Sequence, residues 1–320
     1  MNIALILPTY NAEADLPAFL SALQQQTLQP TTRFAIDSSS RDQTYQILKA
    51  HGFLIEQIPK EKFNHGGTRR LATERIDADI YIVMTQDAIL AKPDALQQLV
   101  SALLSKDDIG CAYARQLPKA KANAMSKHGR YANYPEESYI RYYKDKKQYG
   151  IKTCFNSDNL AAYRQSALIA IGGFPKNVIT AEDAYVAAKL LQQGYGIHYA
   201  ANALIYHSHN LSLLQEFHRY FSVGVFHGQE KWIIDDFKSA TKEGFRFVKS
   251  ELRYLWKTQN VHLIPKAVIS TIVKFLSYQL GLHEQFIPFH LKKNWGINLS
   301  YWLTTVNEHD KTGSNINKTI

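Results

Sequence analysis

Cysteine is scarce: the 320-residue chain contains only Cys111 and Cys154, and neither stands in a CxxC pair. Two isolated cysteines exclude a disulfide framework and are typical of a protein in a reducing compartment. The N-terminus also lacks a basic stretch ahead of its first apolar run. We therefore expect neither disulfides nor a signal peptide.

Long apolar runs are also lacking. The best candidate, residues 263–282, is interrupted by Lys266 and Lys274. A helix that crosses a bilayer needs about 20 predominantly apolar residues. The sequence therefore predicts a chain without a membrane span.

Acidic residues are outnumbered, with 28 Asp and Glu against 37 Lys and Arg and a formal net charge of +9. Part of the excess is local, because residues 115–164 contain 11 basic and 4 acidic side chains. Positive charge favours anionic partners such as nucleotide phosphates, nucleic acid or an anionic membrane face. No nucleic-acid-binding module is recognisable, so we expect no nucleic-acid partner.

Strands and helices alternate along the first part of the chain. Short apolar runs predict strands at 3–8, 33–37, 53–58, 81–88 and 110–115, and helical spacing predicts helices at 16–23, 40–52, 66–76 and 93–104. This alternation predicts an α/β fold with a mostly parallel, Rossmann-like sheet flanked by helices. Ser40 with Gln43 resembles a capping box, and Thr180 is expected to cap a helix over 181–193.

The rest of the chain is less regular. Residues 116–152 are basic and rich in Tyr without a clear period, so we expect an excursion from the sheet. Two further strands are expected at 196–201 and 203–208. We predict one domain over 1–210, a helical, aromatic-rich C-terminal extension over 211–306, and a polar tail over 307–320.

Polar side chains follow each of the first four expected strands. They are Thr9, Tyr10 and Asn11, then Asp37 and Ser39, then His65, Gly66, Gly67 and Arg69, and finally Gln86 and Asp87. The carboxyl ends of parallel strands meet at one sheet edge, where α/β proteins bind ligands. We expect Asp37 to accept from a base imide, and Gly66, Gly67 and Arg69 to offer phosphate contacts. A GxGxxG pattern after the first strand is absent, which disfavours a dinucleotide.

Asp87 is a candidate ligand for a hard divalent cation, although a lone Asp after a strand more often closes a turn. His207 and His209 are spaced to face the same side of a strand and could complete a metal shell, or be structural. Asp183, with Glu182, is a candidate general base. Acidic residues in a first helical turn are also favoured simply by the helix dipole.

Several segments resemble family-2 inverting glycosyltransferases. The segments are PTYNAE, DSSSRDQT, FNHGGTRR, TQDA, RQLP, NYPEES, ITAED and YHSHNLSLLQEFHRYFSVGVFH, in this order from residue 3 to about 255. They are most similar to bacterial rhamnosyltransferases of O-antigen and capsule assembly. The resemblance implies the GT-A fold and transfer of a sugar from a nucleotide-sugar donor.

The resemblance also implies roles for individual residues. Thr9, Tyr10, Asn11 and Asp37 match positions that hold the nucleoside, and His65, Gly66, Gly67 and Arg69 match a loop near the nucleotide. Asp87 matches the last aspartate of a DxD metal motif, completed by His207 or His209 around Mg²⁺ or Mn²⁺. Asp183 matches the catalytic base. Asn156, Ser157, Asp158 and Asn159 match a loop near the donor sugar and the acceptor. Thr85 and Gln86 depart from the acidic DxD pattern, which leaves Asp87 as its single carboxylate.

The implied reaction is metal-dependent, inverting transfer of L-rhamnose from dTDP-rhamnose, or a similar donor, to a free or lipid-linked glycan acceptor. It would take place in the bacterial cytoplasm, at the inner membrane. Aromatic and basic residues mixed after residue 255 suit helices at a membrane surface, and packing between helices explains them equally well. Transfer of another activated hexose, or binding of a nucleotide sugar without catalysis, are the alternatives.

Overall fold

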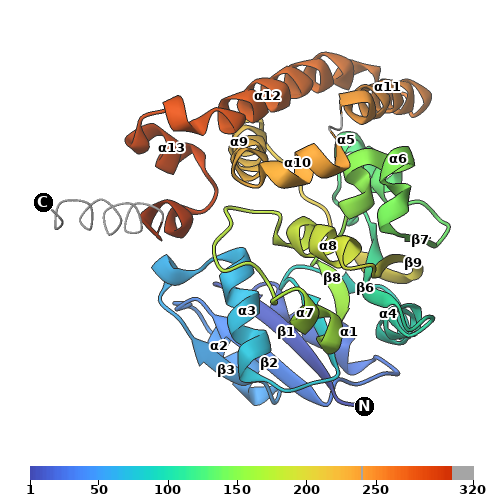
Figure 1. The fold of residues 1–320 in the computed structure, drawn as a ribbon, viewed down its shortest axis with the longest axis vertical. Helices are drawn as coiled ribbons and strands as arrows, with labels where there is room; N and C mark the ends of the chain where they lie inside the picture. The colour runs from blue at the N-terminus through green and yellow to red at the C-terminus, as the bar shows by residue number, and fades with distance from the viewer. Residues whose placement is uncertain (239–240, 305–320) are drawn as a thin grey trace, which may run out of the picture.

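The protein is built on one mixed β-sheet, as shown by the computed structural model, which describes residues 1–238 and 241–304 (Figure 1). Along the sheet the strand order is β3 (Leu54–Gln57), β2 (Thr32–Asp37), β1 (Ile3–Thr9), β4 (Ile80–Met84), β8 (Leu160–Arg164), β6 (Ile109–Leu117), β9 (Gly196–Tyr206) and β5 (Ile89–Leu90). β7 (Tyr139–Arg141) also pairs with β9. The order places β4 and β8 at its centre.

The sheet is mostly, but not wholly, parallel. β3, β2, β1 and β4 are parallel to one another, and β6 is parallel to β9. β5 and β7 are antiparallel to β9. β8 lies antiparallel between β4 and β6. The expected alternation missed this reversal, which has a functional consequence: β8 begins at the edge where β4 ends, so residues 156–159 join the strand-end loops.

Helices cover both faces of the sheet, as predicted. α1 (Leu16–Gln24), α2 (Thr44–Ala50) and α4 (Ala95–Leu103) lie on one face, and α3 (His65–Arg75), α7 (Gln165–Ala170) and α8 (Glu182–Gln192) lie on the other. β1 shows why: Ala4 and Ile6 point into one core, while Leu5 and Leu7 point into the other. A strand buried on both faces needs apolar residues at every position.

Residues 116–152, which were expected to leave the sheet, form two helices and a strand among other elements. α5 (Ala124–Asn133) and α6 (Lys146–Tyr149) flank β7, which returns to the sheet beside β9. The two strands expected at 196–201 and 203–208 are one strand, β9, whose pairing with β6 shifts between Ala114 and Arg115. An irregularity of this kind lets one strand continue where the pattern suggested two.

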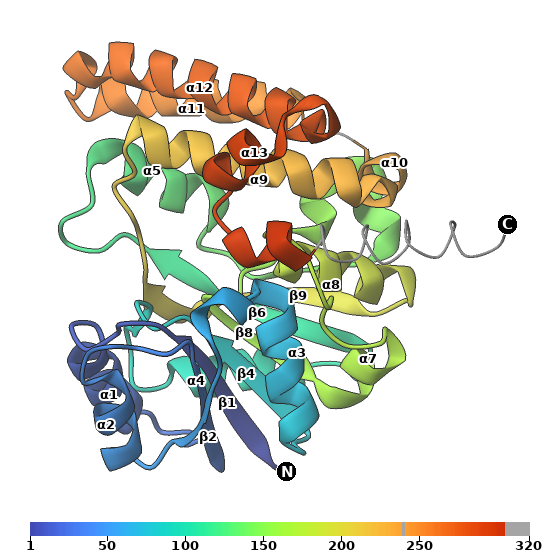
Figure 2. The same ribbon diagram turned by 90° about the vertical axis from the view of Figure 1, so that its left-hand side faces the viewer.

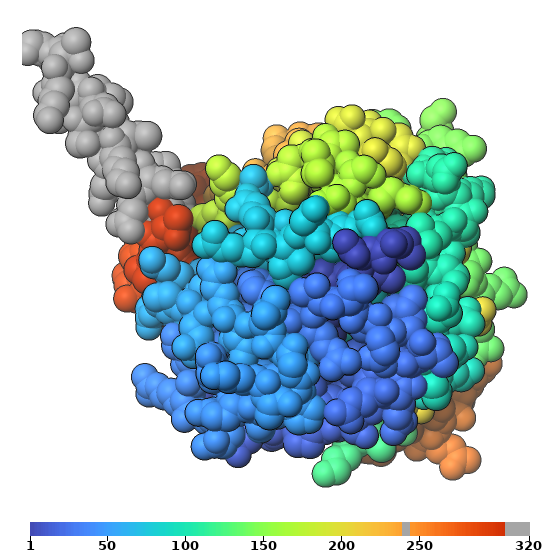
Figure 3. All heavy atoms as spheres, turned by 90° about the horizontal axis from the view of Figure 1, so that it is seen from below, coloured from blue at the N-terminus to red at the C-terminus, as the bar shows by residue number. Residues whose placement is uncertain are grey.

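The described chain after β9 is helical, as expected. It forms α9 (Leu213–Gln229), α10 (Lys231–Phe237), α11 (Thr241–Lys257), α12 (Ile264–Leu282) and α13 (Phe289–Trp295). Figure 2 shows α11 and α12 as an outer layer over α9, on the opposite side from the N-terminal sheet half. The face seen in Figure 3, opposite that layer, is formed mainly by the N-terminal part of the chain. The predicted tail over 307–320 lies outside the described residues.

Two expected helix caps are wrong. The Ser40 hydroxyl donates to Asp37 rather than capping α2, whose N-cap is Gln43 without a side-chain hydrogen bond. Likewise α8 begins after Ala181 rather than Thr180, and Ala181 adopts a left-handed conformation with φ of 60°. Ser40 therefore binds a residue at the end of β2 instead of capping its helix. At α8 the residue before the helix is Ala181, which has no side-chain cap.

Candidate active site

A cavity of about 650 Å³ opens at the carboxyl ends of β1, β2 and β4. Its lining residues from these strand ends and the following loops are Pro8, Thr9, Tyr10, Ser38, Arg41, Lys60, Glu61, Phe63, His65, Arg69, Thr85 and Gln86. The last wall comes from the C-terminal residues Ile297, Asn298, Leu299 and Ser300. The predicted strand-end residues therefore do converge, and their cavity falls in the size range of ordinary ligand pockets.

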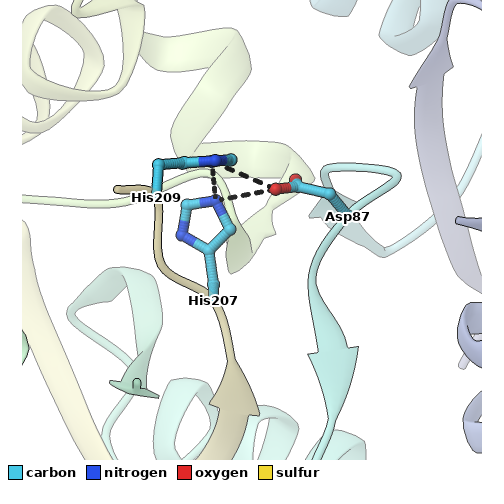
Figure 4. A group of neighbouring side chains, drawn as sticks. All are labelled: Asp87, His207 and His209. Atoms are coloured by element: carbon cyan, nitrogen blue, oxygen red, sulfur yellow. Dashed lines mark hydrogen bonds and ion pairs between the residues drawn. The ribbon is translucent and has the colours of Figure 1, made fainter. Parts of the chain in front are cut away.

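Three potential metal ligands meet, as Figure 4 shows, and Gln86 of the cavity lining is the residue before one of them, Asp87. Asp87 Oδ2 lies 3.2 Å from His207 Nε2 and 3.1 Å from His209 Nε2. Although burial opposes it, hydrogen bonds from the two histidines hold the pKa of Asp87 well below its usual range. The carboxylate oxygen and both imidazole nitrogens lie within 4.8 Å of one another. Oxygen and imidazole ligands of this kind fit a divalent cation.

Neighbouring amides orient His207. Its Nδ1 lies 2.9 Å from Gln116 Oε1, and Asn159 Nδ2 contacts the ring and donates to Thr85 Oγ1 at 3.2 Å. In the neutral tautomer with Nδ1–H given to Gln116, His207 Nε2 would offer its lone pair to an ion in place of its hydrogen bond to Asp87, the usual arrangement behind metal-binding histidines. Both histidines, rather than one, reach Asp87.

Lys119 and Gln116 are members of this site that sequence reasoning did not identify. Lys119 Nζ lies 3.6 Å from Asp87 Oδ2, and Gln116 Oε1 also accepts from Arg130 Nη1 at 2.6 Å. The RQLP segment at the end of β6 was the available signal, since it stands at the same sheet edge as TQDA.

Asp37 is fully buried and its carboxylate is already saturated. It accepts from Thr9 Oγ1 (3.2 Å), from the backbone N–H of Ser40 (3.0 Å) and its hydroxyl, and from Gln57 Nε2 (3.2 Å). The expected bond from a base imide is therefore not open in this arrangement, because an imide N–H would have to replace one of these donors. Here Asp37 ties the ends of β1, β2 and β3 together.

The loop after β1 is fixed by cross-strand bonds. Gln86 Oε1 accepts from the Tyr10 backbone N–H at 2.9 Å, and Asn11 Oδ1 accepts from the Arg41 N–H at 3.0 Å. Lys60 Nζ lies 4.2 Å from the centre of the Tyr10 ring and donates to its hydroxyl at 2.7 Å. Gln86 thus positions the loop, while Tyr10 and Lys60 line the cavity. Ser39 lies outside the lining, and its hydroxyl donates to the carbonyl of Ile58.

Arg69 is not the free phosphate ligand that was expected. It is 2 % exposed, with Nε 2.8 Å from Asp158 Oδ2 and Nη1 2.9 Å from Glu182 Oε1. His65 Nδ1 lies 3.8 Å from the same Glu182 oxygen. Glu182, predicted beside the catalytic base, is therefore a buried partner of Arg69 and has no open face toward a substrate.

The two glycines of the expected phosphate loop have a packing role. A Cβ on Gly66 would lie 2.4 Å from the carbonyl oxygen of Pro175, and one on Gly67 2.7 Å from that of Lys176. The Gly67 N–H donates to Asn64 Oδ1, the cap of α3, so it is not free for phosphate. Glycine here lets α3 approach the segment that leads into α8.

Asp183 stands at the first turn of α8, in a carboxylate-rich environment. Burial raises the pKa of Asp183 well above its usual range, and the charges of Glu182 and Asp158 raise it further. Its Oδ1 accepts only the N–H of Ala184 among the described hydrogen bonds. The left-handed Ala181 precedes it, and strained backbone of this kind is concentrated at functional sites.

The expected sugar loop, residues 156–159, points inward. Asn156 Nδ2 donates to the Tyr163 hydroxyl at 2.8 Å, and Asp158 pairs with Arg69. Ser157 Oγ donates to Asn159 Oδ1 at 2.9 Å, and Asn159 contacts His207. In this arrangement the loop contacts His207 through Asn159 and Arg69 through Asp158, and its contact with a donor sugar or acceptor stays a prediction.

With this geometry, the comparisons with known proteins decide the family. Residues 4–172 match the model of Glycosyl transferase family 2. The chain belongs to this family. It is therefore a glycosyltransferase, and the resemblance noted in its motifs is confirmed. The match ends before α8 and the C-terminal helices, so both candidate histidines and Asp183 lie outside it.

Two curated relatives align along nearly the whole chain. The O-antigen chain rhamnosyltransferase RfbN of Salmonella typhimurium is 44 % identical over 304 residues, covering 94 % of this chain and 96 % of the relative. The O-antigen chain rhamnosyltransferase WbaN of Salmonella anatum is 43 % identical over 303 residues, with the same coverage. The helical C-terminal region is thus shared with these proteins.

Solved structures confirm the GT-A fold. The mannosyltransferase PcManGT from Pyrobaculum calidifontis, solved with GDP-Man and Mn²⁺, is similar with a TM-score of 0.57 and 15 % identity, covering 96 % of this chain and 86 % of that one. Staphylococcus aureus TarS 1–349, solved with UDP-GlcNAc, gives 0.51 and 14 %, covering 89 % and 92 %. GT-A neighbours therefore bind nucleotide sugars, in one case together with Mn²⁺.

Proposed function

We propose that the protein transfers a sugar from a nucleotide-sugar donor with inversion, and that the donor is dTDP-L-rhamnose. The observation that carries the mechanism is the meeting of Asp87, His207 and His209 beside the strand-end cavity. The names of the two curated relatives support rhamnose as the sugar and an O-antigen chain as the acceptor.

Asp183 is the general base of this proposal. Inverting transfer needs a group that takes the proton of the acceptor hydroxyl as it attacks the anomeric carbon. The raised pKa of Asp183 brings its basicity toward neutral pH, where a general base is effective. The Arg69 pairs with Asp158 and Glu182 hold the first turn of α8 in place.

Asp87, His207 and His209 would hold Mg²⁺ or Mn²⁺. When bound, the cation neutralises charge on the diphosphate leaving group. Gln116 fixes the His207 ring, and Asn159 ties that ring to the end of β4 through Thr85. Lys119, beside Asp87, adds a second positive charge for the same diphosphate.

The acceptor side is a second cavity of about 220 Å³ between α5, α9, α11 and α12. His209 lies in its wall, so it adjoins the metal cluster. Its cationic lining residues are Arg130, Arg219, Lys266 and Lys274, against the carboxylates Glu216 and Glu251. Lys274 Nζ pairs with Glu216 Oε1 at 3.1 Å, which leaves an excess of positive charge. Such a lining favours an acceptor that carries phosphate, as a lipid-linked glycan does.

The outer surface of α11 and α12 suits an anionic membrane. Phe245, Trp256, Ile272 and Phe275 are 52–75 % exposed there. Between residues 244 and 304 the carboxylates are Glu251 and Glu284, both buried, whereas eight Lys and Arg occur: Arg246, Lys249, Arg253, Lys257, Lys266, Lys274, Lys292 and Lys293. Apolar and basic residues without exposed acids characterise helices that lie on a membrane.

Val261–Leu282 is, contrary to the expectation from its lysines, long and apolar enough to cross a membrane by length and composition. In the fold this segment packs along α9, and Lys274 is paired with Glu216. We infer that it lies along the membrane face. Trp302, by contrast, is 2 % exposed, so part of the aromatic content serves core packing.

A nucleotide-sugar screen tests the proposed reaction. Purified protein is incubated with dTDP-rhamnose, UDP-hexoses and GDP-mannose, with Mn²⁺ or with EDTA, and release of nucleoside diphosphate is measured. We expect release from dTDP-rhamnose with Mn²⁺ and little with EDTA. Asp87→Ala should lose the Mn²⁺ response, whereas Asp107→Ala, an exposed carboxylate near the opposite end of β6, should keep it. Preference for another donor would refute the rhamnose assignment, and metal-independent turnover would refute the metal cluster.

A further inference from the structure

The strand-end cavity is completed by a segment from the far end of the described chain. Ile297, Asn298, Leu299 and Ser300 form the wall that faces the loops after β1, β2 and β3. In Figure 1 and Figure 2 this last turn stands next to the segment that leads into α3. It lies more than a hundred residues beyond the end of the family match at residue 172.

The segment is held firmly by the helical layer. The Ile297 N–H donates to Ser222 Oγ at 3.0 Å, and His218 Nδ1 lies 2.9 Å from the Trp295 carbonyl oxygen. A Cβ on Gly296 would lie 2.4 Å from Trp302 Nε1, so the chain passes directly over that buried indole. α9 carries Ser222 and His218 and begins shortly after His209, which links this wall to the metal cluster.

Exposure within the segment alternates between side chains. Asn298 and Ser300 are 5 % and 7 % exposed, whereas Ile297 and Leu299 are 47 % and 50 % exposed although both line the cavity. Two large apolar side chains at a cavity wall lose unfavourable contact with water when a ligand covers them. Phe63 adds another apolar group to the lining. The wall is thus suited to an aromatic or sugar ring rather than to phosphate.

We propose that residues 297–300 are part of the donor site, with Ile297 and Leu299 packing against the nucleotide. The inference rests on the proposed function, because it assigns the cavity to the nucleotide-sugar donor. It makes the C-terminal helical layer a component of donor recognition, besides any role at the acceptor or the membrane.

A purely structural role is the competing explanation. Asn298 Oδ1 accepts from the Tyr301 N–H at 3.3 Å, which is the contact of a helix cap, and Tyr301 and Trp302 are buried. Under that explanation Ile297 and Leu299 are incidental surface residues. Leu303, 41 % exposed in the next turn and outside the cavity lining, provides a matched comparison.

The test is a titration of TDP, in Mn²⁺ buffer, into the full chain and into Ile297→Ala, Leu299→Ala and Leu303→Ala, with thermal unfolding of each. Loss of apolar contact should raise the Kd for TDP about five- to tenfold in the first two variants. Leu303→Ala should bind like the unmodified protein, and all three should unfold at similar temperatures. Titration of UDP in parallel shows whether the wall discriminates between bases.

Unchanged TDP affinity in Ile297→Ala and Leu299→Ala would overturn the inference. Equal weakening in all three variants, together with lower unfolding temperatures, would also overturn it in favour of a structural role. If the unmodified protein bound no nucleoside diphosphate, the assignment of the cavity to the donor would itself fail. That outcome is distinguishable because it does not depend on any variant.

Discussion

The pKa of Asp183 is changed by its burial and by the charged residues around it. Glu182 and Asp158 lie close to it, and Arg69 is engaged with both of them rather than with Asp183. Burial and these two charges raise the pKa of Asp183, so its ionised form is destabilised in the folded protein. An ionised Asp183, the form that the proposed general base requires, therefore reduces folding stability.

Asp183→Asn should separate these two effects. Turnover should fall about 10²- to 10⁴-fold, the usual contribution of a general base, while the unfolding temperature stays level or rises. The folded-state pKa exceeds the unfolded value, so the relative stability of the wild type should increase as pH falls through the raised pKa. Turnover at varied pH and thermal unfolding of both proteins measure this. A slower but unstable variant would point to a structural role instead.

Arg69 is the one cation among the carboxylates of this buried cluster, and its removal leaves Asp158 and Glu182 unpaired. Arg69→Met should cost about 3–5 kcal/mol of unfolding free energy, the typical loss on breaking a buried pair. Arg75→Met is the matched control on α3, because the Arg75–Glu56 pair is exposed and a surface ion pair contributes little to stability. Urea denaturation compares them, and equal losses would contradict the buried-network assignment.

The sequence predicted where Asp37, Arg69 and Asp87 lie, but not which hydrogen bonds and ion pairs they form. Strand-end position alone placed Asp37, Arg69 and Asp87 at one sheet edge. It could not show that Asp37 is saturated by Gln57, or that Arg69 pairs with Glu182, because those partners are set by packing between distant segments. Both histidines do reach Asp87, as a shared metal site requires, and its role as a metal ligand stays a prediction.

The periodicity of apolar residues predicted most of the strands and helices of the sheet domain, whereas the two helix caps predicted from polar residues were wrong. β1, β2, β3 and β6 and helices α1, α3 and α4 lie within two residues of their predicted ranges. The strand expected at 81–88 ends at Met84, and the helix expected at 40–52 begins only at Thr44. β8 runs antiparallel because the long segment from β6 returns through α5 and β7, a path that no short-range pattern encodes. Ser40 failed as a cap because Asp37, three residues earlier, takes its hydroxyl and N–H.

The contact between α9 and α12 depends on glycine. A Cβ on Gly281 would lie 2.1 Å from the Phe221 carbonyl oxygen, and one on Gly224 2.2 Å from that of Tyr278. Gly281→Ala should therefore push the helices apart and lower the unfolding temperature by several degrees. Gly129→Ala in α5, with no atom within 4 Å of the added methyl, should be neutral or stabilising by up to about 1 kcal/mol. Calorimetry of both variants checks the contrast; an undisturbed Gly281→Ala would refute the close packing.

In the whole molecule, two cavities adjoin the Asp87–His207–His209 cluster, because Gln86 lines one and His209 lines the other. The proposed donor cavity is built by strand ends of the sheet and residues 297–300, and the proposed acceptor cavity is built by α5 and the helical layer. α9 connects the two, because it contributes Arg219 to the acceptor cavity and anchors the Ile297 wall of the donor cavity. Under the proposed function, the C-terminal helices would contact the membrane, the acceptor and the donor.

The proposed membrane contact of α11 and α12 can be tested with liposomes. The protein should float with liposomes of phosphatidylglycerol and phosphatidylcholine, and less so at high salt, because exposed Lys and Arg attract anionic lipid within a Debye length. Ile272→Asp with Phe275→Asp should abolish flotation by placing charge on the apolar face. Leu54→Asp, a 60 % exposed apolar residue on β3, should leave it intact. If the α12 variant floated as well as the β3 variant, the face would not be the membrane contact, and its aromatic residues would need another partner.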